Sequence, residues 1–148
     1  MNSTRSLKSV RILLLAVLAA GLSASLASAE EYDGKFTLPF EARWGVAVLP
    51  AGDYTFRVDT NNDSCIVSVD QGLRHVALIM VDGGASKGEV AGSSALIAVR
   101  SAGSYRIRAL QLAELGVVLE YMPPKAERQI LAQLPALFQR VPVIAAGK

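Results

Sequence analysis

The sequence predicts an all-β protein, either an antiparallel β-sandwich or a partly closed barrel. We expect about seven to eight short strands and a short C-terminal helix. Two observations predict this fold class. Apolar residues alternate with other residues in one segment after another, which is the period of a strand with one buried face. Stretches rich in Pro, Gly, Asn and Asp separate these segments, as is typical of turns. This pattern predicts one domain after residue 29 of the 148-residue chain, with no internal repeat.

Residues 1–29 have the composition of a secretory signal peptide. Arg5, Lys8 and Arg11 precede an apolar run over residues 12–22, and Ala-Ser-Ala at residues 27–29 is a small-residue cleavage site. The run is too short for a membrane-spanning helix, which needs about 20 apolar residues. We therefore expect cleavage at the end of this segment and an exported protein, periplasmic or secreted, with no stable membrane span.

Loss of the signal peptide changes the charge of the chain. The whole chain has 15 Lys and Arg against 13 Asp and Glu. Three of these bases and none of the acids lie in residues 1–29, which leaves 12 bases against 13 acids. The remaining bases are scattered, apart from a small cluster of Arg100, Arg106 and Arg108. A basic face is therefore not expected. Because binding of a nucleic acid requires such a face, we expect no nucleic-acid partner.

Eight segments have the period of a strand. They cover residues 36–40, 44–48, 54–58, 65–69, 73–81, 95–99, 105–110 and 117–121. In the second segment, Trp44, Val46 and Val48 are expected to share the buried face. Pro39 cannot donate to a ladder, so the first segment is expected at an edge of the sheet. Residues 73–81 are apolar on both faces after His75, which is typical of a central strand.

Turn chemistry occurs between the segments. Residues 49–53 (Leu-Pro-Ala-Gly-Asp) supply the Pro and Gly of a tight turn, and residues 60–63 form a polar hairpin tip. Residues 82–88 are expected to be the longest flexible loop, and residues 102–104 a short turn.

The C-terminal part departs from the strand pattern. Pro123 and Pro124 end the last strand, and residues 125–134 are good helix formers that Pro135 terminates. Ile130, Leu131 and Leu134 fall on one face of this predicted helix. Residues 136–148 have no clear period, and we expect a loose, apolar tail. The predicted organisation is a signal peptide (1–29), a β-domain (30–122), and a short helix and tail (123–148).

Short motifs in the chain resemble a known family. Residues 36–40 (Phe-Thr-Leu-Pro-Phe) form an F-x-x-P-F strand, and residues 49–54 (Leu-Pro-Ala-Gly-Asp-Tyr) form an L-P-A-G-x-Y turn. With Ala-Glu-Arg at residues 126–128, they resemble a family of small exported bacterial proteins of unknown function. The turn is also similar to turns in transthyretin-like and carboxypeptidase-regulatory-like β-domains. The resemblance implies export and an all-β fold, and it brings no catalytic residue.

Asp59, Asn61, Asp63 and Asp70 have the spacing of oxygen ligands in a calcium loop. However, Ser64 stands where such a loop has its turn glycine, and Asp70 replaces the longer glutamate. Strands rather than helices are expected on both sides. A polar hairpin tip is therefore favoured, and a calcium- or small-ligand-binding domain is an alternative function.

His75 is the only histidine in the chain. It is a candidate general base only if the fold supplies an acid, such as Asp82 or Glu120, and a nucleophile, such as Ser93 or Ser94. The chain lacks a G-x-S-x-G elbow. A hydrogen-bonded or solvent-facing strand histidine is favoured, and a hydrolase built around His75 is the second alternative.

Cys65 begins an apolar stripe with Val67 and Val69. A buried inert thiol is therefore favoured over a nucleophile, a redox centre or an intermolecular bridge. The glycine-rich residues 83–88 lack the G-x-x-x-x-G-K-[ST] pattern, so a strand connection is favoured over a phosphate loop.

Aromatic and basic residues offer two weaker candidates. A stacking platform for a sugar or peptide would use Phe40, Trp44, Tyr54 and Tyr105, but their strand spacing favours core packing for most of them. Arg106 and Arg108 are expected to share a strand face with Leu110 and to form a partner-facing edge.

The leading interpretation is an exported, non-enzymatic β-domain that acts as a binding or structural module of the cell envelope. We expect a protein or glycan partner, which binds a sheet face or adds a strand to an exposed edge. No cofactor, catalytic residue or resident metal is expected.

Overall fold

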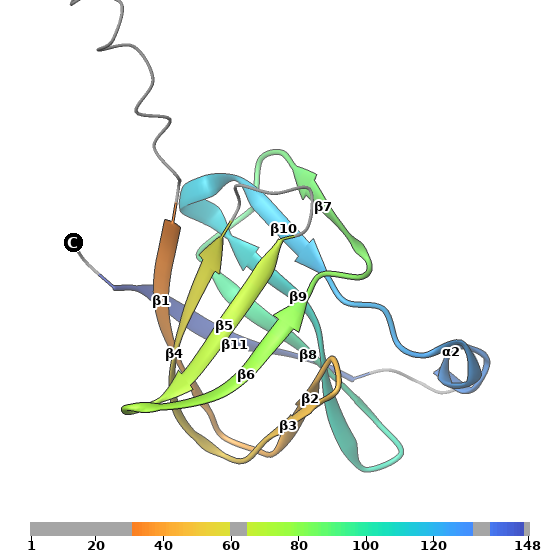
Figure 1. Ribbon diagram of the computed structural model, residues 1–148. Helices are drawn as coiled ribbons and strands as arrows, with labels where there is room; N and C mark the ends of the chain where they lie inside the picture. Colours follow the sequence, from red (N-terminus) through yellow and green to blue (C-terminus); the bar gives the residue numbers. More distant parts are fainter. Residues whose placement is uncertain (1–30, 60–64, 132–136, 147–148) are drawn as a thin grey trace, which may run out of the picture.

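The computed structural model describes residues 31–59, 65–131 and 137–146 of the chain (Figure 1). In chain order its elements are β1 (Glu31–Leu38), β2 (Ala42–Trp44), β3 (Ala47–Leu49), β4 (Gly52–Asp59), β5 (Ile66–Gln71), β6 (Arg74–Met80), β7 (Gly84–Lys87), β8 (Ala95–Ser101), β9 (Ser104–Leu112), the 3-10 turn η1 (Ala113–Leu115), β10 (Val117–Glu120), α2 (Lys125–Leu131) and β11 (Leu137–Ala145). The predicted all-β fold with a short C-terminal helix is confirmed.

The strands form one curved sheet. Its order is β3-β2-β9-β8-β11-β1-β4-β5-β6, and β10 pairs with both β9 and β7. All pairs are antiparallel except β2–β9, which is parallel. The two ends of the order, β3 and β6, come into contact, so the sheet nearly closes on itself (Figure 1). Of the two predicted arrangements, the molecule has the partly closed barrel.

Aromatic side chains fill much of the interior. The Phe36 ring lies 5.4 Å from the Tyr54 ring and 5.9 Å from each of the Trp44 and Phe56 rings, measured between centroids. These residues come from three strands and are all buried. Tyr54 and Phe56 are two residues apart in β4, which places both on the same side of the sheet.

The segment at residues 44–48 is a hairpin rather than one strand. Trp44 is fully buried, as predicted, but Val46 is 99% exposed and Val48 is 47% exposed. Gly45 has φ of 60°, a left-handed conformation that turns the chain between β2 and β3. The prediction that Trp44, Val46 and Val48 share a buried face is therefore wrong for Val46 and Val48.

The predicted loose tail is also wrong, because residues 137–145 form β11 in the interior of the sheet. β11 pairs with β8 over residues 137–142 and with β1 over residues 143–145. Pro142 lies where the strand passes from one partner to the other. Only Val141 and Val143 are buried in β11, so the strand has too few inward-facing apolar residues to show a clear period.

Three further expectations about strand position are corrected. β1 lies between β11 and β4, and it ends at Leu38, one residue before Pro39, so it is not an edge strand. β6 lies at the end of the strand order instead of in the centre. The expected flexible loop at residues 82–88 contains β7, which pairs with β10. The predicted turns at residues 49–53 and 102–104 do separate consecutive strands.

The predicted helix begins at Lys125, as expected. Residues 132–135, the polar hairpin tip at residues 60–63 and the signal peptide lie outside the described residues.

Candidate functional site

β6 is the longest strand that has a single partner among the described residues. Three strands have one partner each: β3, β6 and β7. β3 has three residues and β7 has four, all polar or small, whereas β6 has seven. Short or polar edges resist pairing with other chains, and long apolar edges favour it. β6 is therefore the edge most suited to binding another strand.

Half of the backbone groups of β6 form no ladder with a neighbouring strand of the described ranges. The N–H of Val81, just after the strand, donates to the carbonyl of Cys65 over 3.2 Å. Because alternate residues of an antiparallel strand face the same neighbour, the groups of Ile79 also face β5. The N–H and carbonyl groups of Leu78 and Met80 consequently point away from β5.

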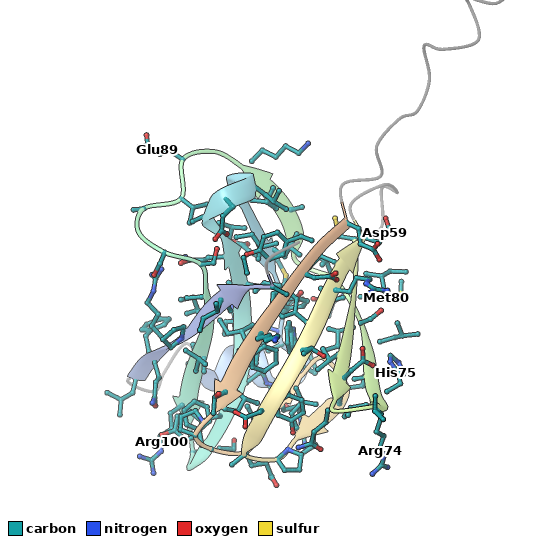
Figure 2. The ribbon with its side chains drawn as sticks, turned by 90° about the vertical axis from the view of Figure 1, so that its left-hand side faces the viewer. Asp59, Arg74, His75, Met80, Glu89 and Arg100 are labelled. Atoms are coloured by element: carbon teal, nitrogen blue, oxygen red, sulfur yellow. The ribbon has the colours of Figure 1, made fainter. Side chains whose placement is uncertain are left out.

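The side chains at these two positions are exposed as well. Leu78 is 61% exposed and Met80 is 64% exposed, on the outer face of the sheet. They lie opposite Ser68 and Ile66 of β5. Figure 2 shows Met80 and His75 along the outer edge of the sheet, directed away from it. The C-terminal half of β6 thus combines backbone groups that pair with no second strand of the described chain and exposed apolar side chains.

The N-terminal half of β6 is charged and irregular. The β5–β6 register shifts between Val69 and Asp70, so Val76 is an extra residue in β6. Nδ1 of His75 lies 2.9 Å from Oδ1 of Asp70, and both side chains are exposed. Arg74 is also exposed. A bulge and charges hinder pairing, which restricts the open edge to residues 77–80.

His75 does not meet the residues that a hydrolase would require. Its carboxylate partner is Asp70, whereas Asp82 accepts a hydrogen bond from the N–H of Met122 at 2.8 Å. Ser94 is 2% exposed and donates to Glu114 over 2.6 Å. A hydrogen-bonded strand histidine, the favoured interpretation, agrees with this geometry.

A polar cluster that the sequence did not reveal joins β1, η1 and the segment before β8. Oε2 of Glu114 accepts hydrogen bonds from Tyr32 at 2.8 Å and from Ser94 at 2.6 Å. The N–H of Ala113 donates to the Ser94 hydroxyl. Hydrogen bonds from Ser94 and Tyr32 lower the pKa of Glu114, while burial and the nearby carboxylate raise the pKa of Tyr32 to about 12. The cluster fixes three segments that are distant in sequence, so no local pattern predicts it.

Of the four calcium candidates, the structure describes Asp59 and Asp70, and it does not bring these two together. Asn61 and Asp63 lie outside the described residues. Asp70 lies opposite Thr55, four residues along β4 from Asp59, a separation of about 13 Å at roughly 3.3 Å per residue. Asp59 and Asp70 are therefore too far apart to bind one ion directly. Among the described residues, no three His, Cys, Asp or Glu side chains are grouped to hold a metal.

Cys65 is free and partly buried against the core. Trp44 and Tyr54 belong to the core, whereas Phe40 and Tyr105 are partly exposed and stack on each other with centroids 3.7 Å apart. The glycine-rich residues 83–88 form a strand and its flanks, in agreement with a strand connection.

The expected common face of Arg106, Arg108 and Leu110 is wrong. Ala98 lies opposite Ile107, and the preceding Ile97 lies opposite Ala109, so Arg108 is the extra residue of a bulge in β9. The bulge reverses the alternation, and Leu110 is fully buried.

These observations define the class of the molecule: a nearly closed, all-β module in which β6, the longest edge strand of the described ranges, has exposed apolar side chains. No helix within the described ranges is both long and apolar enough to cross a membrane. Comparisons with protein-family models, with curated proteins and with solved structures find no significant match.

Proposed function

We propose that the protein is an exported, non-enzymatic binding module that pairs β6 with an extended segment of a protein partner in the cell envelope. The observation that carries the proposal is the edge at residues 77–80, where the backbone groups of Leu78 and Met80 point away from β5 and their apolar side chains are exposed. Export rests on the signal-peptide composition of residues 1–29.

A polypeptide suits this edge better than a glycan. The outward groups of β6 alternate between donors and acceptors with the spacing of a β-ladder, and an extended peptide presents the complementary series. Each hydrogen bond gained contributes about 0.5–1.5 kcal/mol net. Complete burial of a Leu or Met side chain contributes about 1.5–3 kcal/mol. Pairing along residues 77–80 is therefore expected to be weak and reversible, because these gains are offset by the entropy lost on association.

The non-enzymatic character is supported by the arrangement of the reactive side chains. The His75–Asp70 pair joins β6 and β5 and is exposed, and Ser94 is buried as a donor to Glu114. Neither forms a pair of nucleophile and base.

A proline substitution tests the proposal. Leu78→Pro removes an outward N–H but no hydrogen bond to β5, because Leu78 does not face that strand. The protein is used to capture partners from an envelope extract, and hydrogen exchange is then followed on the complex by mass spectrometry. We expect Leu78→Pro to lose the captured protein, and we expect slowed amide exchange at residues 78 and 80 in the wild-type complex.

Ala85→Pro is the matched control. Gly88 N–H donates to the carbonyl of Gly116, so by alternation Ala85 also points its N–H away from its partner strand, on the short β7 edge. This variant should retain the partner. Thermal unfolding verifies that both variants are folded. Equal capture by Leu78→Pro, or exchange protection away from β6, would contradict binding at this edge.

A further inference from the structure

A second surface, separate from β6, has the character of a ligand site. It is a groove on the outside of β2 and β9, beside the β8–β9 turn and α2, with a volume of about 570 Å³. This volume is within the range of small-molecule sites, about 300–1,000 Å³. Its charged lining consists of Arg43, Arg106, Arg108, Glu41 and Glu127.

The arginines of the groove place like charges close together. Arg43 and Arg106 lie directly opposite each other on the parallel strands β2 and β9, and like charges in this position destabilise a sheet. The bulge in β9 inserts Arg108 two residues further along the same strand. The three basic residues therefore concentrate positive charge on one rim of the groove.

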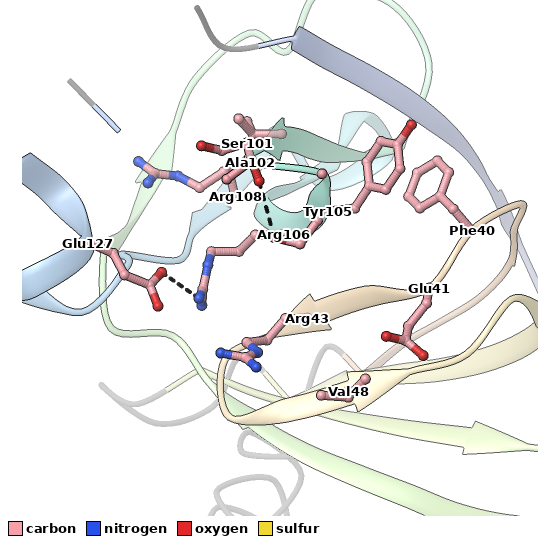
Figure 3. Close-up of a pocket in the computed structure, with 13 residues that line it drawn as sticks. Phe40, Glu41, Arg43, Val48, Ser101, Ala102, Tyr105, Arg106, Arg108 and Glu127 are labelled. Carbon is pink, nitrogen blue, oxygen red and sulfur yellow. Dashed lines mark hydrogen bonds and ion pairs between the residues drawn. The ribbon is translucent and has the colours of Figure 1, made fainter. Parts of the chain in front are cut away.

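One carboxylate partly compensates this charge. Oε2 of Glu127, in the first turn of α2, lies 2.6 Å from Nη2 of Arg106. The Arg106 side chain is only 16% exposed, so this pair is less screened by water than an ordinary surface pair. Within the described ranges, Arg43 and Arg108 form no ion pair. Figure 3 shows Glu127 approaching Arg106 from the helix, with the Arg43 side chain nearby.

We propose that this groove binds a small carboxylate-bearing ligand, and that Glu127 occupies the ligand's position on Arg106 until the ligand displaces it. A guanidinium group binds a carboxylate through two parallel hydrogen bonds, and Glu127 demonstrates that a carboxylate reaches Arg106. Arg43, across the ladder from Arg106, is placed to hold the incoming group. Val48, 47% exposed in the lining, gives the non-polar part of the ligand a surface to contact.

The proposal is tested by calorimetric titration of the protein with glutarate, with glutaramide as the neutral control of equal length. Glutarate should bind and glutaramide should not, and high salt should weaken the interaction. Glu127→Gln removes the internal competitor, so it should raise the affinity for glutarate about three- to fivefold, which corresponds to the loss of a partly exposed ion pair. Arg43→Ala should lower the affinity about tenfold.

Glu41→Gln is the matched control for Glu127→Gln. Both substitutions remove one negative charge from the groove, but among the described residues Glu41 forms no ion pair with Arg106, so its effect should be below about twofold. Failure of glutarate to bind Glu127→Gln, an equal gain in both variants, or tighter binding of inorganic phosphate than of glutarate would overturn the proposal. Leu78→Pro should bind glutarate like the wild type, which separates this site from the β6 edge.

Discussion

Gly34 is a residue whose role is visible only in the packed molecule. It lies opposite Phe56 on the neighbouring strand β4, and both face the interior. A Cβ atom at Gly34 would overlap the Phe56 ring. The missing side chain therefore makes room for the aromatic ring, which packs against Tyr32 and Phe36.

We predict that Gly34→Ala lowers the free energy of unfolding by about 1–3 kcal/mol, the usual cost of overpacking a core. Gly88→Ala is the control, because a Cβ atom there meets no other atom within 4 Å. Denaturant titration of the two variants measures the difference. Equal stability of both would show that the Phe56 ring shifts without cost.

The Glu114 cluster makes stability depend on pH. Because hydrogen bonds from Ser94 and Tyr32 lower the pKa of Glu114 in the folded state, the unfolded chain binds a proton more readily. The contribution of Glu114 is thus present above its ordinary pKa of 4.5 and is lost as the pH falls through its lowered value.

Glu114→Gln should therefore reduce the acid sensitivity of the protein. Its Tm should fall less than that of the wild type between neutral pH and about pH 3, although the variant is less stable at neutral pH. Thermal unfolding across this range provides the measurement, with Glu89→Gln in the exposed loop before β8 as the control. Parallel curves for Glu114→Gln and the wild type would exclude this role.

At the scale of the elements, β11 joins the two halves of the sheet. It pairs with β8 on one side and β1 on the other, and it buries Val141 and Val143 in the core. Without it, two interior strands would expose their hydrogen-bonding edges, which costs stability and favours aggregation.

Truncation tests the importance of β11. A chain that ends before Leu137 should lose its cooperative unfolding transition or aggregate, whereas a chain that ends after Ala146 should retain a Tm close to that of the full chain. Circular dichroism during heating distinguishes these results. Cooperative unfolding of the shorter chain would mean that β1 and β8 are stable as separate edges.

Bulges are the other element-scale feature that local patterns miss. Residues 105–110 predict one alternation, but the extra Arg108 reverses it, so Ile107 and Leu110 are both buried. An inserted residue is defined by the strand opposite it. The sequence identified Arg106 and Arg108 as candidates. It placed them on the wrong face of the strand, because the bulge is not visible in a local pattern.

At the scale of the whole molecule, the all-β class and most strand positions follow from short-range patterns. Tyr54, Phe56 and Val58 alternate with polar neighbours and are all buried in β4. Such alternation depends only on the geometry of an extended chain. The alternation of buried and exposed residues in β4 therefore does not depend on which strands lie beside it.

Which strands are edges depends on pairing between distant segments. β6 contains Leu78 and Ile79, two similar apolar residues, yet Ile79 is buried and Leu78 is exposed. Their apolar character suggested a central strand, but Leu78 alternates with Ile79 onto the outer face of the sheet, which no other described element covers at this position. The groove likewise joins residues of β2, β9 and α2, whose separation in sequence hides their proximity.

The sequence alone determined the strand period, the turns and the short helix, because each results from the conformational preferences of neighbouring residues. It also carried the composition on which the expectation of export rests. The tertiary structure decided the near closure of the sheet, the insertion of β11, the exposed edge of β6 and the meeting of Arg43 with Arg106. These features arise from hydrogen bonds and packing between segments far apart in the chain, which no local pattern contains.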